Sequence, residues 1–297
     1  MRWIVLVVAT LLLAKEPIIP IPAKISYDKE KAALGKTLFF DPNLSRDRSI
    51  SCSSCHDFDH AGADPRAVSI GVYGRKGRLN APPVFNAVFN FRQFWNGRAK
   101  DLKEQAKGPL FNPIEMGMDK KLLLERLDAN EFYKRAFWRL YKRAPSIEDL
   151  IDAIVEYEKS LVTPNAKFDR YLKGETKLTK KELQGYLLFK ELGCITCHNG
   201  VNIGGNSFQK MGLLHPYPHT LGDRYEVTHD PRDRGVYKVP TLRNIALTAP
   251  YFHDGSAKTL KEAIKKIGYY NLGIDLEEEE IEKIEAFLKT LTAKIEP

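Results

Sequence analysis

The chain has 297 residues, of which 43% are hydrophobic and 28% are charged, a composition typical of a folded protein and not of a disordered one. Its length favours two domains. The net charge of +8 favours acidic partners, but the basic residues are scattered among acidic ones, so we expect no nucleic-acid binding.

The only long apolar run extends from Trp3 to Ala14. It is shorter than the roughly 20 residues of a membrane-spanning helix, so a multi-pass membrane protein is excluded. The run follows Met1-Arg2 and ends at a small residue, as in a secretory signal peptide. We therefore expect a signal peptide and proline-rich leader over residues 1–22 and a periplasmic protein. The alternative is an uncleaved N-terminal anchor.

Local signals predict several helices in chain order. Residues 28–40 are interpreted as the first helix. Ser146, followed by acidic residues, opens a second helix, and Thr179 with Glu182 forms a capping box that opens a third. The last helix is expected to start near Leu276, with one buried stripe made of Ile281, Ile284, Leu288 and Leu291.

Long segments rich in Gly, Pro and Asn separate these helices. They cover residues 71–83, 108–117 and 200–218, and we interpret all three as loops. Loops of this length in a compact protein are often functional. Residues 163–165 (Thr-Pro-Asn) are interpreted as a linker between two halves of similar organisation.

All the cysteines of the chain fall in one pattern, C-x-x-C-H, which occurs twice: Cys52, Cys55 and His56, then Cys194, Cys197 and His198. This is the covalent attachment site of a c-type haem, in which two thiols add to the porphyrin vinyl groups and the histidine ligates iron. Two disulfides or one four-thiolate zinc site are the alternatives, but zinc would leave both histidines unexplained. We predict two covalently bound haems c.

The sequence also resembles the bacterial dihaem cytochrome c peroxidases, which are related to the dihaem oxidases that modify tryptophan side chains. The resemblance covers nearly the whole chain after the leader. It is carried by LGKTLFFDPNLS (34–45), RLNAPPVFNAVFNFRQFWNGRA (78–99), EQAKGP (104–109), SLVTPNAKFDRYLKG (160–174), GCITCHNGVNIGG (193–205) and VPTLRNIALTAPYFHDGS (239–256). It implies a mainly α fold with little β structure and two cytochrome c-like haem domains, 23–163 and 164–297.

The resemblance also implies that the two haems have different roles. The haem on His56 would be peroxidatic, and the haem on His198 would accept electrons from a small soluble donor, a cytochrome c or a cupredoxin. Trp95 matches the tryptophan between the two haems. Glu115 and Gln105 match the distal pair that handles the protons and the orientation of hydrogen peroxide.

Further positions carry binding roles by the same resemblance. Arg243 matches a residue that pairs with haem propionates. Asn80, Thr248 and Pro250 match the ligands of a calcium ion at the domain interface, and oxygen-only ligation suits calcium. The family also implies a homodimer.

The sequence departs from the family at two positions. Many members carry a blocking histidine ligand where this chain has Val72, so we expect an open His56 iron that needs no reductive activation; His60 is interpreted as a surface residue. Ile267 stands where family members place the methionine ligand of the second haem. Tyr269, Tyr270 and Met211 remain candidate sixth ligands, and a five-coordinate iron is the alternative.

We therefore predict a periplasmic dihaem cytochrome c peroxidase that reduces hydrogen peroxide to water. One alternative is a dihaem oxidase acting on a protein or an aromatic substrate, which the missing methionine at Ile267 favours. The other is a dihaem electron carrier, which would require both irons to be six-coordinate.

Overall fold

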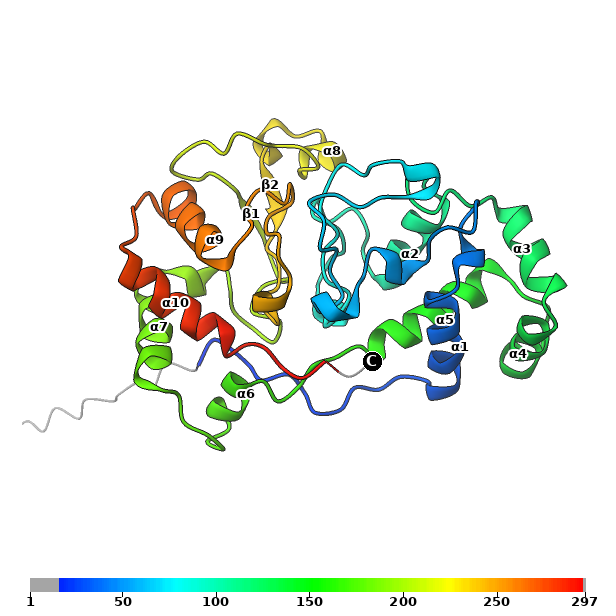
Figure 1. Ribbon diagram of the computed structural model, residues 1–297, viewed down its shortest axis with the longest axis horizontal. Coiled ribbons are helices and arrows are strands. Elements are labelled where there is room, and N and C mark those ends of the chain that lie inside the picture. Colours follow the sequence, from blue (N-terminus) through cyan, green and yellow to red (C-terminus); the bar gives the residue numbers. More distant parts are fainter. Residues whose placement is uncertain (1–15, 296–297) are drawn as a thin grey trace, which may run out of the picture.

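The computed structural model describes residues 16–295, and the protein is mainly helical, as predicted. Two lobes lie side by side (Figure 1). The N-terminal lobe holds five helices: α1 (Lys29–Phe39), α2 (Leu102–Phe111), α3 (Lys120–Ala129), α4 (Glu131–Tyr141) and α5 (Ile147–Ser160). The C-terminal lobe holds α6 (Lys167–Leu172), α7 (Lys180–Glu191), α8 (Tyr225–Thr228), α9 (Leu260–Ile267) and α10 (Glu278–Lys289). Its two short strands, β1 (Phe208–Lys210) and β2 (Val236–Lys238), pair antiparallel.

Each lobe is organised around one pair of packed helices. In the N-terminal lobe α1 packs against α5, and Gly35 allows the approach because a Cβ there would overlap the backbone carbonyl of Ala153. In the C-terminal lobe α7 packs against α10, where Gly185 lies against the carbonyl of Lys283 in the same way. In both lobes the first helix of the pair precedes a C-x-x-C-H motif, so the two halves share one plan.

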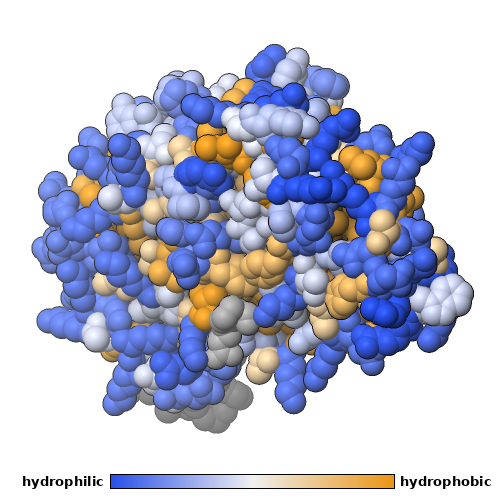
Figure 2. Space-filling model, turned by 45° about the vertical axis from the view of Figure 1, so that its right-hand side comes forward, coloured by the Kyte–Doolittle hydropathy of each residue, from blue (hydrophilic) through white to orange (hydrophobic). Residues whose placement is uncertain are grey.

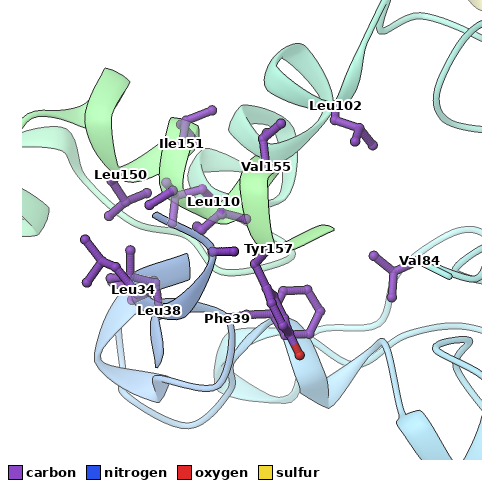
Figure 3. Packing of buried hydrophobic residues seen from close by; sticks show 14 of the residues in the cluster. Leu34, Leu38, Phe39, Val84, Leu102, Leu110, Leu150, Ile151, Val155 and Tyr157 are labelled. Atoms are coloured by element: carbon purple, nitrogen blue, oxygen red, sulfur yellow. The ribbon is translucent and has the colours of Figure 1, made fainter. Parts of the chain in front are cut away.

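Two separate hydrophobic cores follow from these pairs. The first includes Leu38, Phe39 and Leu150, whose packing is seen in Figure 3. The second is built around Phe168 and Phe287, neither of which is exposed. The first core ends at Leu161 and the second includes Phe168, and the domain boundary at 163/164 stays a prediction.

The predicted helix starts agree with the observed caps. The side chains of Asp28, Ser146 and Thr179 accept hydrogen bonds from the first turns of α1, α5 and α7. The last helix begins slightly later than expected, because Glu277 and Glu280 form its capping box. The expected loop over 108–117 is wrong at its start, because α2 continues through Pro109 to Phe111.

The first described residues pack on the C-terminal lobe, and the last described residues pack on the N-terminal lobe. The predicted signal peptide lies largely outside the described residues, but Ile18 and Ile21 of the expected leader are 2% and 1% exposed. The backbone around Ile18 pairs with Gly200, just after the second C-x-x-C-H motif. The chain then runs along the lower side of Figure 1 to α1 in the other lobe. Near the other end, Ile295 packs against the N-terminal core.

Polar contacts join the lobes in the interior. The Thr163 hydroxyl accepts hydrogen bonds from the side-chain amides of Asn86 (2.8 Å) and Asn244 (3.0 Å), all three residues being buried. Hydrophilic residues dominate the face shown in Figure 2, with apolar patches between them. Among residues 16–295 no helix has the length and apolar character needed to cross a membrane.

Candidate active site

Both C-x-x-C-H motifs adopt the same local structure. Each pair of cysteines lies in a short 3₁₀ turn, and the backbone N–H of the following histidine donates to the carbonyl of the first cysteine. The Nδ1 of His56 lies 2.9 Å from the carbonyl oxygen of Gly62, and that of His198 lies 3.2 Å from the carbonyl oxygen of Ile203. With the proton on Nδ1 donated to these carbonyls, the Nε2 lone pair of each imidazole is free to bind iron.

The chemistry of these residues fits a covalent haem in each lobe. All four thiols are unpaired, and Cys52 and Cys194 contact different cores, so one four-thiolate site cannot form. Burial lowers the pKa of His56 and brings that of His198 to about 4, so both imidazoles are neutral, which is the form that ligates metal.

A large cavity lies in front of His56. It encloses about 560 Å³, within the usual range for cofactor and ligand sites. Both thiols of the first motif line it, together with apolar side chains that Figure 3 labels: Phe39, Val84, Leu102 and Leu110. Residues of the C-terminal lobe, including Lys238, complete the wall. This apolar enclosure beside two thiols and an available imidazole is what a haem requires.

Glu115 and Gln105 both line this cavity, although they come from a loop and from α2. The Asn112 side chain donates to Glu115 Oε1 at 2.8 Å. Burial raises the pKa of the Glu115 carboxyl above its ordinary value, and the Arg98 guanidinium, another cavity residue, partly offsets this rise. A carboxyl group with a raised pKa in a cofactor cavity is a candidate to take up and release a proton during a reaction.

The loop that carries Val72 packs directly on the loop that carries Glu115. The Val72 backbone N–H donates to the Glu115 carbonyl at 2.9 Å, and the Val72 side chain is fully buried. A Cβ on Gly71 would overlap the carbonyl of Ile114, so the approach requires glycine there. His60 is half-buried and its Nδ1 lies 2.9 Å from Asp57 Oδ2.

Trp95 lies where the two lobes meet. It lines the cavity, and its indole N–H donates to the carbonyl of Asn80 at 2.9 Å. Its own carbonyl accepts from the backbone N–H of Lys238, and its ring lies 6.2 Å from that of His253. Trp95 thus contacts both lobes, and its place between two haems stays a prediction.

The positions predicted to hold calcium lie near the same junction. The Asn80 backbone N–H donates to the His253 carbonyl at 2.8 Å, which brings Asn80 close to the segment of Thr248 and Pro250. The Asn80 Nδ2 donates to the Arg66 carbonyl at 2.8 Å. Within the described chain, no hydrogen bond is donated to its Oδ1, so this oxygen is available to a cation.

Arg243 is fully enclosed in the C-terminal lobe. Its guanidinium donates to Asp169 at 2.6 Å and to the carbonyls of Val201 and Ile19 at 2.9 Å each. These protein acceptors engage Nε and both terminal nitrogens. The contact of Arg243 with a haem propionate remains a prediction.

The candidate sixth ligands of the second haem lie in and near a π-helical turn, Gly268–Leu272, which follows Ile267 at the end of α9. Tyr269 is exposed and stacks on His215 at 4.3 Å, whereas the Tyr270 ring packs on Tyr217 at 4.9 Å. Both tyrosines therefore have packing partners of their own within the C-terminal lobe.

Several charged cavity residues are absent from the sequence-based prediction, among them Arg98, Glu158 and Lys238. Glu158 Oε2 is buried without a hydrogen-bond partner, and burial raises the pKa of this carboxyl to about 8. In the sequence Glu158 and Lys238 look like ordinary charged residues of a helix and a strand, so no local pattern identifies them.

Comparisons with known proteins agree with this geometry. The family model of di-haem cytochrome c peroxidase matches residues 29–177, and that of cytochrome c matches residues 183–292. The chain is 46% identical to the cytochrome c551 peroxidase of Nitrosomonas europaea, with 96% of this chain and 86% of that protein covered. It is 42% identical to the cytochrome c551 peroxidase of Pseudomonas aeruginosa, with 93% and 84% covered.

A solved structure shares the fold as well. A MauG-like protein associated with microbial copper homeostasis matches with a TM-score of 0.82 and 33% identity, covering 96% of this chain and 95% of that one. The paired haem-attachment motifs and these similarities lead to one conclusion: the chain belongs to the family of dihaem cytochrome c peroxidases.

Proposed function

We propose that this protein reduces hydrogen peroxide to water in the cavity of His56, with electrons that arrive singly from a small redox protein at the His198 haem. The observation that carries the proposal is the placement of Glu115, a half-buried carboxyl with a raised pKa, in the same cavity as His56 and the first pair of thiols. The haem iron, when bound, would supply the site at which hydrogen peroxide binds and is reduced.

The protein's own part is to move protons and to position peroxide. The overall reaction consumes one hydrogen peroxide, two protons and two electrons and yields two water molecules. Glu115 would take a proton from one oxygen of hydrogen peroxide and return it to the other oxygen. Asn112 fixes the carboxyl by its 2.8 Å hydrogen bond, and Gln105 orients peroxide from α2.

Electrons pass between the lobes by way of Trp95, whose contacts with Asn80 and Lys238 hold the indole at the junction. Calcium bound by Asn80, Thr248 and Pro250 would stabilise the same junction. The donor is a small protein with an acidic surface, such as a cytochrome c or a cupredoxin, because the chain carries a net charge of +8. The protein acts in the periplasm after export by its N-terminal signal, and it forms a homodimer.

The oxidised enzyme is active without prior reduction, because Val72 replaces the blocking ligand and lies buried against the Glu115 loop. The test mixes the fully oxidised, calcium-loaded protein with reduced cytochrome c and hydrogen peroxide. Immediate donor oxidation is expected. A lag that ends only after one-electron reduction would show that another residue blocks the His56 iron.

Replacement of the proton carrier tests the site itself. Glu115→Gln keeps the shape of the side chain but cannot exchange protons, so turnover should fall by about 10²–10⁴-fold. The control is Glu125→Gln, an exposed carboxylate of α3, which should retain full turnover. Unchanged activity in Glu115→Gln would refute the assigned role.

The dihaem oxidase remains a second candidate because Ile267 supplies no thioether ligand at the end of α9. Peroxide-dependent oxidation of an aromatic or protein substrate, without oxidation of reduced cytochrome c, would favour it over the peroxidase.

A further inference from the structure

Lys238, the last residue of β2, is a buried cationic residue in the wall of the His56 cavity. It is only 4% exposed. Its backbone N–H donates to the Trp95 carbonyl at 2.7 Å, which fixes the residue at the contact between the lobes. A basic side chain of the C-terminal lobe thus borders a cavity that is built mainly by the N-terminal lobe.

The amine of Lys238 lacks a counter-charge. Among residues 16–295, none accepts a hydrogen bond from its Nζ or forms an ion pair with it. Three carboxyl groups line the cavity, and none of them pairs with Lys238. Glu226 pairs with Arg78 at 3.0 Å, Glu115 accepts a hydrogen bond from Asn112, and Oε2 of Glu158 has no hydrogen-bond partner. Burial alone acts on the lysine, lowering its pKa to about 8. Burying a cation without a partner lowers the stability of the folded protein, so we expect an anion inside the cavity to neutralise Lys238.

We propose that Lys238 binds a carboxylate of the haem attached at Cys52 and Cys55, so that one lobe supplies the counter-charge for the cofactor of the other. Haem carries two carboxylate groups, and the cavity that Lys238 lines is also lined by both attachment cysteines. The inference rests on the haem site of the proposed function but is independent of the peroxide reaction.

A consequence for electron transfer follows. A positive charge in a cavity of low dielectric favours the reduced haem, because reduction adds one negative charge nearby. Lys238 therefore raises the reduction potential of the His56 haem. Its backbone contact with Trp95 places this charge beside the proposed electron path.

The test is a spectroelectrochemical titration of the full protein with both haems bound. Lys238→Met removes the charge and keeps much of the volume, so the oxidised-to-reduced ratio of one haem at a fixed potential should rise at least tenfold, which is 59 mV for a one-electron couple. The second haem should change little. Lys238→Arg should stay close to the wild type.

The matched control is Lys210→Met, which removes the same charge from an exposed position on the partner strand β1. A shift in Lys238→Met no larger than in this control would overturn the proposal. If Lys238→Met does not fold, Lys238→Gln provides the same comparison. A wild-type potential that depends on chloride or phosphate concentration, with the dependence lost in the variant, would show an exchangeable anion and also overturn it.

Haem content and peroxide turnover are measured separately on the same samples. A protein that binds two haems and shows the shift without turning over peroxide would support the role of Lys238 while refuting the proposed function.

Discussion

Glu158 offers a direct test of the electrostatics of the cavity. It lies in the last turn of α5, is 6% exposed, and its Oε2 has no hydrogen-bond partner. Burial raises the pKa of this carboxyl from 4.5 to about 8, so the folded protein holds a proton there that the unfolded chain has lost at neutral pH. The perturbation is Glu158→Gln, which keeps the shape of the side chain and titrates in neither state.

The sign and the size of the effect follow from proton linkage. Between pH 4.5 and about 8 the folded state binds one more proton than the unfolded state, so the wild-type free energy of unfolding falls as pH rises. Each pKa unit corresponds to about 1.4 kcal/mol, which gives a total on the order of 5 kcal/mol across this window. Glu158→Gln lacks this loss, so its stability relative to the wild type should grow with pH and level off above about 8.

The assay is urea unfolding of the haem-loaded protein at pH 5, 6.5 and 8.5, followed by circular dichroism. We expect the difference in unfolding free energy between Glu158→Gln and the wild type to grow by several kcal/mol across the series. The control is Glu148→Gln, an exposed carboxylate in the first turn of the same helix, whose difference should stay nearly constant. Parallel pH profiles for Glu158→Gln and the wild type would refute a buried neutral carboxyl.

Three further substitutions test the packing. Gly185→Ala should lower the free energy of unfolding by about 1–3 kcal/mol, because the added Cβ would overlap the Lys283 carbonyl of α10. An unchanged midpoint of thermal unfolding would contradict the close packing of α7 on α10. Arg243→Met should lower the free energy of unfolding by about 3–5 kcal/mol, since it leaves Asp169 as an unpaired buried charge. If the lost ion pair is the cause, adding Asp169→Leu should restore much of this stability. Ile18→Ala should lower the free energy of unfolding, measured in urea, by about 2–4 kcal/mol. Ile19→Ala, at a position that is 47% exposed, should lower it by less than about 0.5 kcal/mol. Equal effects of the two substitutions would show that Ile18 is not part of the core.

Features set by neighbouring residues could be predicted from the sequence. The capping residues Asp28, Ser146 and Thr179 mark helix starts because each side chain bonds to backbone groups two or three residues away. The two C-x-x-C-H motifs are equally local, since attachment and ligation need only five consecutive residues. Helices α2, α3 and α4 are not among the helices predicted from the sequence, although Asp101, Asp119 and Asn130 cap them, because Asp and Asn side chains stabilise turns as well as helix starts.

The composition of the cavity, by contrast, depends on residues far apart in the chain. Sequence resemblance selected Trp95, Glu115 and Gln105, but only the structure shows that they line one cavity with His56. It alone shows that Ile18 belongs to the C-terminal core.

The sequence by itself therefore determined the two haem-attachment sites and the starts of α1, α5 and α7, whose causes lie within a few residues. Only the tertiary structure decided which charged groups lose their contact with water. Lys238 on a strand and Glu158 on a helix have shifted pKa values because distant segments of the chain enclose them. Burial is a property of the packed chain, and it changes the charge energetics of residues whose local sequence is ordinary.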